Sequence, residues 1–351
     1  MAGKTRVLLV DDSAVVRGLL RSIFESDDSF EVMGEAANGA EAVAQVRRER
    51  PGLIAMDLEM PLMGGIEAIE EIMSFRPVPI LVVSDYAHAQ NAFNAVAHGA
   101  VDVVAKPALS ESEIRSFLCR ARLVASIPVI THVKTMRQRT GRASPLPAFP
   151  RILSPGSAQG PIFALAASTG GPQALTSVLG QLPSNFSSPI LIAQHVIPGF
   201  AAGMAKWLAT ESSLPVKLAE QGEPIVPGQV YLSPSEAHLS VAAGEKVDLI
   251  ALRTSDTYRP SCNLLLESVA TVCGRRSVGI VLTGMGSDGA RGLASIKSAG
   301  GRTMAQDEAS SVIYGMNRVA IEGGDVDEVL PIDEISDAMV RLVCEADRRW
   351  T

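Results

Sequence analysis

The chain has 351 residues, of which 47% are hydrophobic, 20% are charged and 4% are aromatic, and its net charge is −7. This composition is typical of a folded chain long enough for two domains, and it excludes an intrinsically disordered protein. The acidic balance and the scarcity of aromatic rings also exclude a nucleic-acid-binding surface over most of the chain.

No apolar run approaches the ~20 residues that a membrane helix needs. The amino-terminal stretch turns acidic at Asp11, where a secretory signal would stay apolar. We therefore expect a cytoplasmic protein with no direct membrane insertion. Four cysteines stand far apart without metal-type or redox-type pairing, which is typical of inert thiols in a reducing compartment. These are Cys119, Cys262, Cys273 and Cys344.

The first region, residues 1–125, alternates short aliphatic runs with amphipathic runs of helix length. This alternation predicts a doubly wound, flavodoxin-like α/β domain with a five-stranded parallel sheet. The expected strands are 6–10, 31–36, 52–57, 79–84 and 102–107, and the expected helices are 14–24, 39–49, 64–75, 92–99 and 112–123.

Polar residues follow the expected strands of this region. Asp11 and Asp12 end the first strand, Asp57 ends the third, Ser84 ends the fourth, and Lys106 follows the fifth. Because ligands of open parallel sheets bind at the carboxyl ends of the strands, we expect these groups to converge. Three crowded carboxylates favour a hard divalent cation such as Mg²⁺. A cation and an ammonium beside an aspartate also make that carboxylate a candidate nucleophile toward phosphorus.

A simpler interpretation is that each aspartate caps the helix that follows it. The full set in this order is hard to explain as caps alone, and residues 5–125 resemble a response-regulator receiver domain through "VDDS", "MDLEMP", Ser84 and "KP". The resemblance implies phosphorylation by a histidine kinase. It implies these roles: Asp57 as the phosphoacceptor, Asp11, Asp12, Asp57 and the carbonyl of Glu59 as Mg²⁺ ligands, and Ser84 and Lys106 as phosphoryl-binding residues.

Two positions depart from the receiver pattern. Val103 stands where receivers commonly have an aromatic residue that moves on activation, and Gly64 stands where the usual Met-Asp-Gly turn has aspartate. We expect phosphorylation to survive both changes and the aromatic switch to be absent.

Residues 126–160 are rich in Pro, Gly, Ser and Arg and lack a periodic apolar pattern, which predicts a linker. No acidic residue occurs between Glu113 and Glu211. The basic segment is either a solvated tether or a contact for an acidic partner or the neighbouring domain, and the sequence leaves both open.

The second region, residues 161–351, repeats the alternation of strands and helices. It predicts a larger Rossmann-like domain with a mostly parallel sheet and some short hairpin structure near 216–252. The expected strands include 161–168, 189–195, 229–234 and 279–286.

The first of these strands ends at "ASTGG", with Ser168 and Thr169 beside two glycines. The sequence of this turn differs too much from the P-loop and dinucleotide-binding patterns to predict a phosphate site. It also does not match the G-x-S-x-G nucleophile elbow of the α/β-hydrolases. From this turn alone, the simplest interpretation of Ser168 is that it caps the helix that follows. The glycines would also let a substrate backbone or an oxyanion approach the serine.

Two further strand ends change this interpretation. His195 ends the next strand, and Asp288 lies in a glycine-rich turn after a later one. A serine, a histidine and an aspartate at neighbouring strand ends are typical of a nucleophile, a general base and an orienting acid. The backbone N–H groups of residues 284–286 suit an oxyanion hole, because glycines can turn them inward.

This region resembles the catalytic domain of the chemotaxis protein-glutamate methylesterase (CheB) family. The matching segments are "ASTGGP", "QHVIPGFAAGMA", "LSPSEAHL", "YRPSCNLLLESVA", "VLTGMGSDGARGL" and "GGRTMAQDEASSVIYGMNRVA". The resemblance implies Ser168 as nucleophile, His195 as base and Asp288 as its partner, with Thr169 and the Met285 N–H in support. It also implies hydrolysis of glutamate γ-methyl esters on chemoreceptor helices, with release of methanol, and deamidation of receptor glutamines.

Some positions depart from this pattern as well. Ala166 replaces a common glycine, Asn263 a usual aspartate and Asn317 a usual proline, while His238 belongs to the pattern without an obvious chemical role. We expect His238 to be structural or to line the substrate site.

Together the two resemblances predict a phosphorylation-activated methylesterase in which the receiver covers the Ser168 site until Asp57 is phosphorylated. The expected partners are a chemotaxis histidine kinase and chemoreceptor helices, the expected state is a monomer, and no cofactor is expected for the ester reaction. The alternative is a catalytically silent, phosphorylation-dependent binding module. A transcriptional regulator lacks support because no basic recognition helix follows the receiver.

Overall fold

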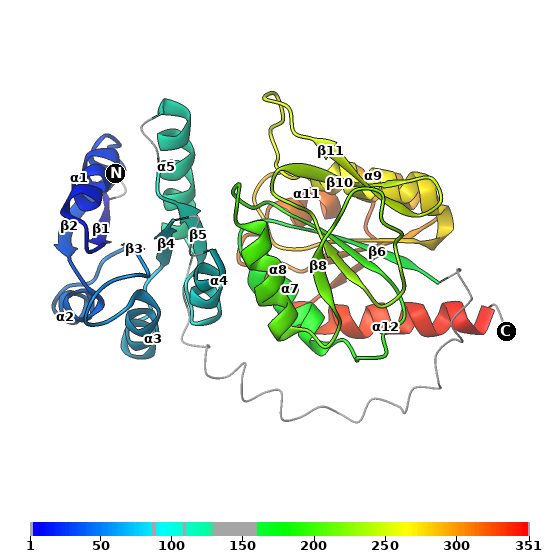
Figure 1. Cartoon of the computed structure of the whole chain (residues 1–351), viewed down its shortest axis with the longest axis horizontal. Helices are drawn as coiled ribbons and strands as arrows, with labels where there is room; N and C mark the ends of the chain where they lie inside the picture. The colour runs from blue at the N-terminus through cyan, green and yellow to red at the C-terminus, as the bar shows by residue number, and fades with distance from the viewer. Residues whose placement is uncertain (1–2, 86–88, 108–109, 128, 130–159, 350–351) are drawn as a thin grey trace. The chain divides into compact units, whose positions relative to one another are not determined.

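The computed structural model in Figure 1 describes residues 3–85, 89–107, 110–127, 129 and 160–349. It consists of two compact units, Met1–Leu146 and Pro147–Thr351. The predicted linker at 126–160 lies almost wholly outside the described residues, so it stays a prediction. None of the described helices is long and apolar enough to cross a membrane.

The first unit is a five-stranded parallel sheet in the order β2-β1-β3-β4-β5, with helices between successive strands (Figure 1). Its central strands are apolar on both faces because helices cover both sides of a doubly wound sheet. This confirms the predicted flavodoxin-like fold. The strands are β1 Thr5–Val10, β2 Phe30–Ala36, β3 Leu53–Met56, β4 Ile80–Ser84 and β5 Asp102–Ala105; the helices are α1 Ala14–Glu25, α2 Gly39–Arg48, α3 Gly65–Phe75, α4 Ala89–Ala97 and α5 Glu111–Ala125.

The strand order of this sheet reverses between β1 and β3, which places the ends of these two strands beside each other. The Asp57 N–H donates to the Val10 carbonyl at 2.8 Å, so Asp57 continues the pairing of β3 with β1. The residues that end β1 and β3 therefore meet at the switch point, where open α/β sheets bind their ligands.

The second unit contains a seven-stranded parallel sheet in the order β14-β13-β12-β6-β7-β9-β8. This confirms the predicted larger parallel-sheet domain. Its strands are β6 Ile162–Ala167, β7 Ile190–Gln194, β8 Val216–Leu218, β9 Val230–Leu232, β12 Ser277–Val281, β13 Arg302–Gln306 and β14 Glu328–Leu330; its helices are α7 Gly171–Gln181, α8 Ala201–Glu211, α9 Cys262–Cys273, η2 Gly274–Arg276, α10 Ala290–Ser298, α11 Met316–Glu322 and α12 Ile332–Arg349.

The order of this sheet reverses between β6 and β12. The chain first moves outward from β6 through β7, and later returns to the other side of β6 to continue from β12 through β14. Every β6 residue is buried, because strands flank it on both sides and helices cover both faces. The carboxyl ends of β6, β7 and β12 consequently form the second switch point of the molecule.

The expected hairpin near 216–252 is present over part of that range. The antiparallel pair is β10 Ala237–Ala242 with β11 Lys246–Ala251, joined by residues 243–245, of which Gly244 and Glu245 have positive φ. Two successive positive φ angles are typical of the tight turns that match strand twist. The earlier strands β8 and β9 instead extend the parallel sheet at its edge.

Candidate functional site

The acidic residues of the first unit converge as predicted. Carboxylate oxygens of Asp11, Asp12 and Asp57 lie within 4.8 Å of one another. The Lys106 Nζ lies 2.9 Å from Asp57 Oδ2 and 3.1 Å from Asp11 Oδ2. Helix capping does not explain the aspartates, because the α1 cap is Ser13 and the α3 cap is Gly64.

Burial shapes the charges of this pocket. Burial raises the pKa of the Asp11 carboxyl, and the nearby Asp57 charge raises it further. Although burial alone would lower the pKa of Lys106, its hydrogen bonds to Asp57 and Asp11 raise it above the usual range. One ammonium therefore faces three carboxylates, and the pocket keeps an excess of negative charge.

This oxygen donor set fits a hard divalent cation such as Mg²⁺. Asp11 Oδ2 is buried and accepts no hydrogen bond within the described chain, although it pairs electrostatically with Lys106. Ser84 is buried at the end of β4, beside the end of β5, where the Lys106 N–H donates to its carbonyl. Asp85, which no sequence pattern singled out, also lies beside this ammonium, with its Oδ2 3.5 Å from Lys106 Nζ. The role of the Glu59 carbonyl stays a prediction.

The turn after β6 excludes the capping interpretation of Ser168. The N-cap of α7 is Gly170, which has a φ of 77°, and no side chain caps this helix. Ser168 is 5% exposed, and its side chain makes no hydrogen bond within the described residues, whereas its carbonyl accepts the Gly171 N–H at 2.8 Å. The Ser168 hydroxyl therefore neither caps the helix nor holds another part of the described chain in place.

The two glycines of this turn have a packing role that was not expected from the sequence. A Cβ on Gly170 would lie 2.5 Å from the Val312 side chain, and one on Gly171 would lie 1.9 Å from Gln194 Oε1. Protein atoms fill the space where these side chains would stand, so packing requires glycine at both positions. The approach of a substrate backbone or an oxyanion to the serine stays a prediction.

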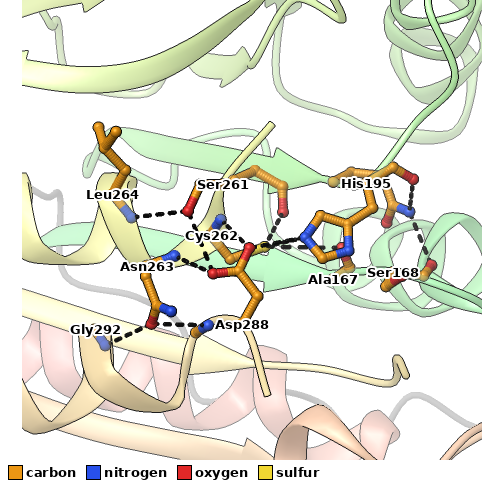
Figure 2. Close-up of polar contacts among 12 residues, drawn as sticks. Ala167, Ser168, His195, Ser261, Cys262, Asn263, Leu264, Asp288 and Gly292 are labelled. Carbon is orange, nitrogen blue, oxygen red and sulfur yellow. Dashed lines mark hydrogen bonds and ion pairs between the residues drawn. The ribbon is translucent and has the colours of Figure 1, made fainter. Parts of the chain in front are cut away.

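His195 and Asp288 form the predicted pair. His195 Nε2 lies 2.8 Å from Asp288 Oδ2 (Figure 2). Asp288 is fully buried and lies against the N-terminus of α9. Its two carboxylate oxygens also accept the N–H groups of Cys262 and Asn263 and the Ser261 hydroxyl. Donors at a helix N-terminus stabilise a carboxylate.

These contacts set the protonation states. Burial alone would raise the pKa of Asp288, but its hydrogen bond to His195 and the N–H groups of α9 hold it below its usual range. An ionised Asp288 makes Nε2 of His195 the protonated nitrogen. Nδ1 then has no hydrogen-bond partner among the described residues and is available to accept a proton.

Ser168 and Asp288 lie on either side of the His195 ring in Figure 2. The structure therefore brings all three predicted residues to one edge of the sheet. It contains the hydrogen bond between His195 and Asp288, and it does not contain one between Ser168 Oγ and His195.

The expected set of oxyanion donors needs one correction. The Gly284 N–H donates to the Ile313 carbonyl at 3.0 Å and is unavailable to a ligand. The Met285 N–H makes no hydrogen bond within the described chain, and the Met285 side chain is 45% exposed. Met285 thus remains a candidate donor, while Thr169 is buried and its carbonyl accepts the Thr283 hydroxyl at 3.0 Å.

Comparison with known proteins follows the same division of the chain. The family described as CheB methylesterase matches residues 163–339, and the family described as response regulator receiver domain matches residues 7–118. The chain belongs to the CheB methylesterase family. Its receiver unit belongs to the response regulator receiver family.

Relatives of this family extend over the whole chain. "Protein-glutamate methylesterase/protein-glutamine glutaminase 3" of Paramagnetospirillum magneticum is 53% identical, covering 97% of this chain and 96% of its own. A similarly named protein of Anaeromyxobacter dehalogenans is 42% identical, covering 96% of each chain. The crystal structure of the Thermotoga maritima CheB methylesterase catalytic domain is 37% identical with a TM-score of 0.51, and covers 52% of this chain and 99% of that one.

The departures from the CheB pattern are compatible with this geometry. Asn263 Oδ1 accepts the N–H groups of Gly289 and Gly292, and so fixes the start of α10 directly after Asp288. Asn317 is fully buried, and its Nδ2 donates to the Gln306 carbonyl. Both asparagines satisfy backbone groups, and Asn263 does so without adding a charge beside Asp288.

His238 has the structural role, which was one of the two roles expected for it. Its Nδ1 accepts the Ser261 N–H at 2.8 Å, and its Nε2 lies 2.9 Å from Asp256 Oδ2. These bonds order the segment that carries Tyr258, whose ring stacks on His195 at 5.2 Å with an interplanar angle of 11°. His238 is therefore structural.

Two further residues near Ser168 were missed from the sequence. Gln194, the last residue of β7, donates to the Ser168 carbonyl at 2.8 Å. Thr283, shortly after β12, accepts the Ile313 N–H at 2.9 Å and donates to the Thr169 carbonyl. Both are polar residues at the ends of buried strands, which is the same signal that identified His195.

Thr283 carries a testable expectation. Replacing Thr283 with valine preserves shape but leaves the Ile313 N–H without its acceptor, so we expect a loss of about 1–3 kcal/mol in the free energy of unfolding. We also expect a lower kcat for ester hydrolysis, because the turn that carries Ser168 and Thr169 loses a support. Urea unfolding and methanol release measure the two effects.

Thr303 provides the matched control. It is equally buried in β13, and its hydroxyl accepts the Asp327 N–H at 3.0 Å, away from the Ser168 turn. Because the Thr303 carbonyl also accepts that N–H at 3.0 Å, Thr303→Val should cost less stability than Thr283→Val. It should leave kcat near the wild-type value, and Thr283→Ser should restore both quantities. Equal losses of kcat in Thr283→Val and Thr303→Val would show that Thr283 acts through stability alone.

Proposed function

We propose that this chain is a phosphorylation-activated protein-glutamate methylesterase that also deamidates protein glutamine. The observation that supports it most is the imidazole–carboxylate pair of His195 and Asp288 at the switch point that also carries Ser168. Family membership and the names of the full-length relatives point to the same activity.

In the proposed reaction, Ser168 Oγ attacks the γ-carbonyl carbon of the ester while His195 Nδ1 takes the hydroxyl proton. Asp288 stabilises the imidazolium, and the Met285 N–H donates to the oxyanion. Methanol leaves with the proton from Nδ1, and an acyl-enzyme remains. Water then attacks this acyl group with the same base, which yields glutamate and free Ser168. A glutamine substrate follows the same course and releases ammonia.

The receiver unit supplies the control in this proposal. Asp57 accepts a phosphoryl group from a chemotaxis histidine kinase, while Lys106 neutralises charge on the phosphoryl oxygens and Ser84 donates to them. Asp11, Asp12, Asp57 and the Glu59 carbonyl would hold a Mg²⁺ ion. When bound, that ion supplies further neutralisation between carboxylates and phosphate.

The proposed substrate is the cytoplasmic helical part of a methyl-accepting chemoreceptor. Hydrolysis of an ester there restores a negative charge to the helix and changes its packing through repulsion between like charges. Phosphorylation adds roughly −1.5 to −2 charge at Asp57, which is the proposed trigger for access to Ser168. We further propose residues 1–125 and 161–351 as the domain limits and a monomeric, cytoplasmic state.

Methanol release with and without a small phosphodonor tests this control. For the whole chain we expect phosphodonor and Mg²⁺ to raise the rate by roughly 5- to 150-fold, the range of typical coupling energies. In Asp57→Asn the rate should no longer respond, because the acceptor oxygen is gone, while the unstimulated rate persists. A phosphodonor response retained in Asp57→Asn would contradict the assignment of Asp57.

A further inference from the structure

The thiol of Cys262 lies beside the imidazole of the proposed base. Cys262 is the first residue of α9 and is fully buried. Its Sγ lies 3.5 Å from His195 Nε2 and donates to the Ala193 carbonyl at 3.3 Å. Asp288 Oδ2 lies 2.8 Å from the same Nε2, so a sulfur, a nitrogen and an oxygen converge (Figure 2).

The spacing of these three atoms suits a tetrahedral zinc ion. All three lie within 4.8 Å of one another. With Zn–S near 2.3 Å and Zn–N near 2.0 Å, the sulfur and nitrogen ligands of a tetrahedral ion lie about 3.5 Å apart. The observed Sγ–Nε2 distance is 3.5 Å. The 2.8 Å between Nε2 and Oδ2 must widen by about half an ångström.

We propose that His195, Cys262 and Asp288 form an inhibitory binding site for Zn²⁺. A thiolate and a carboxylate balance the two charges of the ion, so the complex is neutral in its buried setting. Thiolate and imidazole ligands also favour Zn²⁺ over Mg²⁺. The ring of His195 is partly accessible, with 11% of its side chain exposed, which provides the approach.

Binding displaces protons in a defined way. The thiol of Cys262 loses its proton to solvent and forms the Zn–S bond. The Nε2 lone pair of His195 forms the Zn–N bond, so the neutral ring carries its proton on Nδ1. Because Nδ1 is then a donor, it cannot accept the Ser168 proton. This last step rests on the proposed role of His195 as base, whereas the binding itself does not.

Cys273 lies at the other end of α9 and is also buried, but no imidazole accompanies its thiol in the described contacts. Cys273 is the natural control.

Titration with Co²⁺ tests the site, because a thiolate bound to Co²⁺ gives a charge-transfer absorption that oxygen ligands do not. The protein is the full chain with Cys119 and Cys344 replaced by serine, and millimolar Mg²⁺ occupies the receiver pocket. We expect one equivalent of Co²⁺ to produce the band and Zn²⁺ to displace it. Methanol release should fall at least ~10-fold with bound Zn²⁺ and recover on chelation.

Variants at the two buried cysteines decide the outcome. Cys262→Val should lose the band and weaken Zn²⁺ binding by about 10-fold or more, and Cys273→Val should retain both. Cys262→Ser serves as a second variant, with circular dichroism confirming the fold. Absence of the band in the parent protein, or its persistence in Cys262→Val, would overturn the site, and binding without inhibition would overturn its inhibitory role. If the metal-free parent released no methanol, the proposed esterase function would fail while the spectroscopic result stood.

Discussion

Replacing Ser168 by alanine is expected to lower methanol release from methylated chemoreceptor fragments by about 10³- to 10⁶-fold. The reason is the loss of the only proposed nucleophile, with the oxyanion donors and substrate binding left intact. The Ser168 side chain forms no hydrogen bond within the described residues, so the substitution should leave the free energy of unfolding nearly unchanged. Release of volatile methanol from methyl-labelled receptor fragments measures the activity.

Ser233→Ala is the matched control for this variant. Ser233 is also buried and follows the carboxyl end of β9 in the same sheet, where its hydroxyl donates to the Ala237 carbonyl at 3.2 Å. It should retain activity near that of the wild type. Equal methanol release by Ser168→Ala and the wild type would place the nucleophile elsewhere. No release by either protein would favour the phosphorylation-dependent binding module.

Replacing Asp288 by asparagine should lower kcat/KM by about 10⁴-fold, as loss of the orienting carboxylate does in other serine hydrolases. The Asp288 oxygens face donors on all sides: His195 Nε2 and the Cys262 N–H at one, the Asn263 N–H and the Ser261 hydroxyl at the other. The NH₂ group of an asparagine at this position would face hydrogen-bond donors in either orientation of the amide. If the NH₂ group faces His195, it donates to Nε2, so the imidazole carries its proton on Nδ1. A protonated Nδ1 cannot accept the Ser168 proton.

Asp256→Asn is the comparison for this second variant. Asp256 likewise contacts a histidine Nε2, that of His238, but the pair lies outside the proposed triad. Its effect on kcat/KM should stay within about tenfold, well short of the loss expected for Asp288→Asn. Similar losses in the two variants would contradict the special role of Asp288.

The pH dependence of stability gives an independent measure of Asp288. Its folded pKa lies below its usual value, so its ionisation stabilises the fold above the unfolded pKa of about 3.9. That contribution is lost as the pH falls through the folded pKa. Asp288→Asn should therefore flatten the acid side of the stability profile measured by urea unfolding.

Much of the fold was predictable from the sequence because both sheets are parallel and buried. Their strands are aliphatic runs, and the residues after the runs are conspicuously polar. The rule that ligands bind at the carboxyl ends of strands was enough to group Asp11, Asp57 and Lys106, and separately Ser168, His195 and Asp288. The contacts Lys106–Asp57 and His195–Asp288 confirm that these four residues meet in pairs, while the role of Ser168 stays a prediction.

What the sequence did not reveal depends on contacts between distant segments. The start of α9 binds Asp288, and the loop before α11 supports the Ser168 turn through Thr283. Neither contact follows from periodicity, because each requires the packing of a loop from another part of the chain. The packing role of the glycines at 170 and 171 was missed for the same reason, since Val312 and Gln194 occupy the space where side chains would stand.

The position of β6 has a consequence for synthesis of the protein. Its neighbour on one side, β7, follows soon after it in the chain, but its neighbour on the other side, β12, begins only at Ser277. A growing chain therefore presents an unpaired apolar edge on the fully buried strand β6 while more than a hundred residues before β12 are still to be made. Such an edge is a template for pairing with other chains, and long-range pairing is slow. This edge therefore stays open to pairing with other chains until β12 is made, and the candidate site cannot be complete before Asp288 has been added.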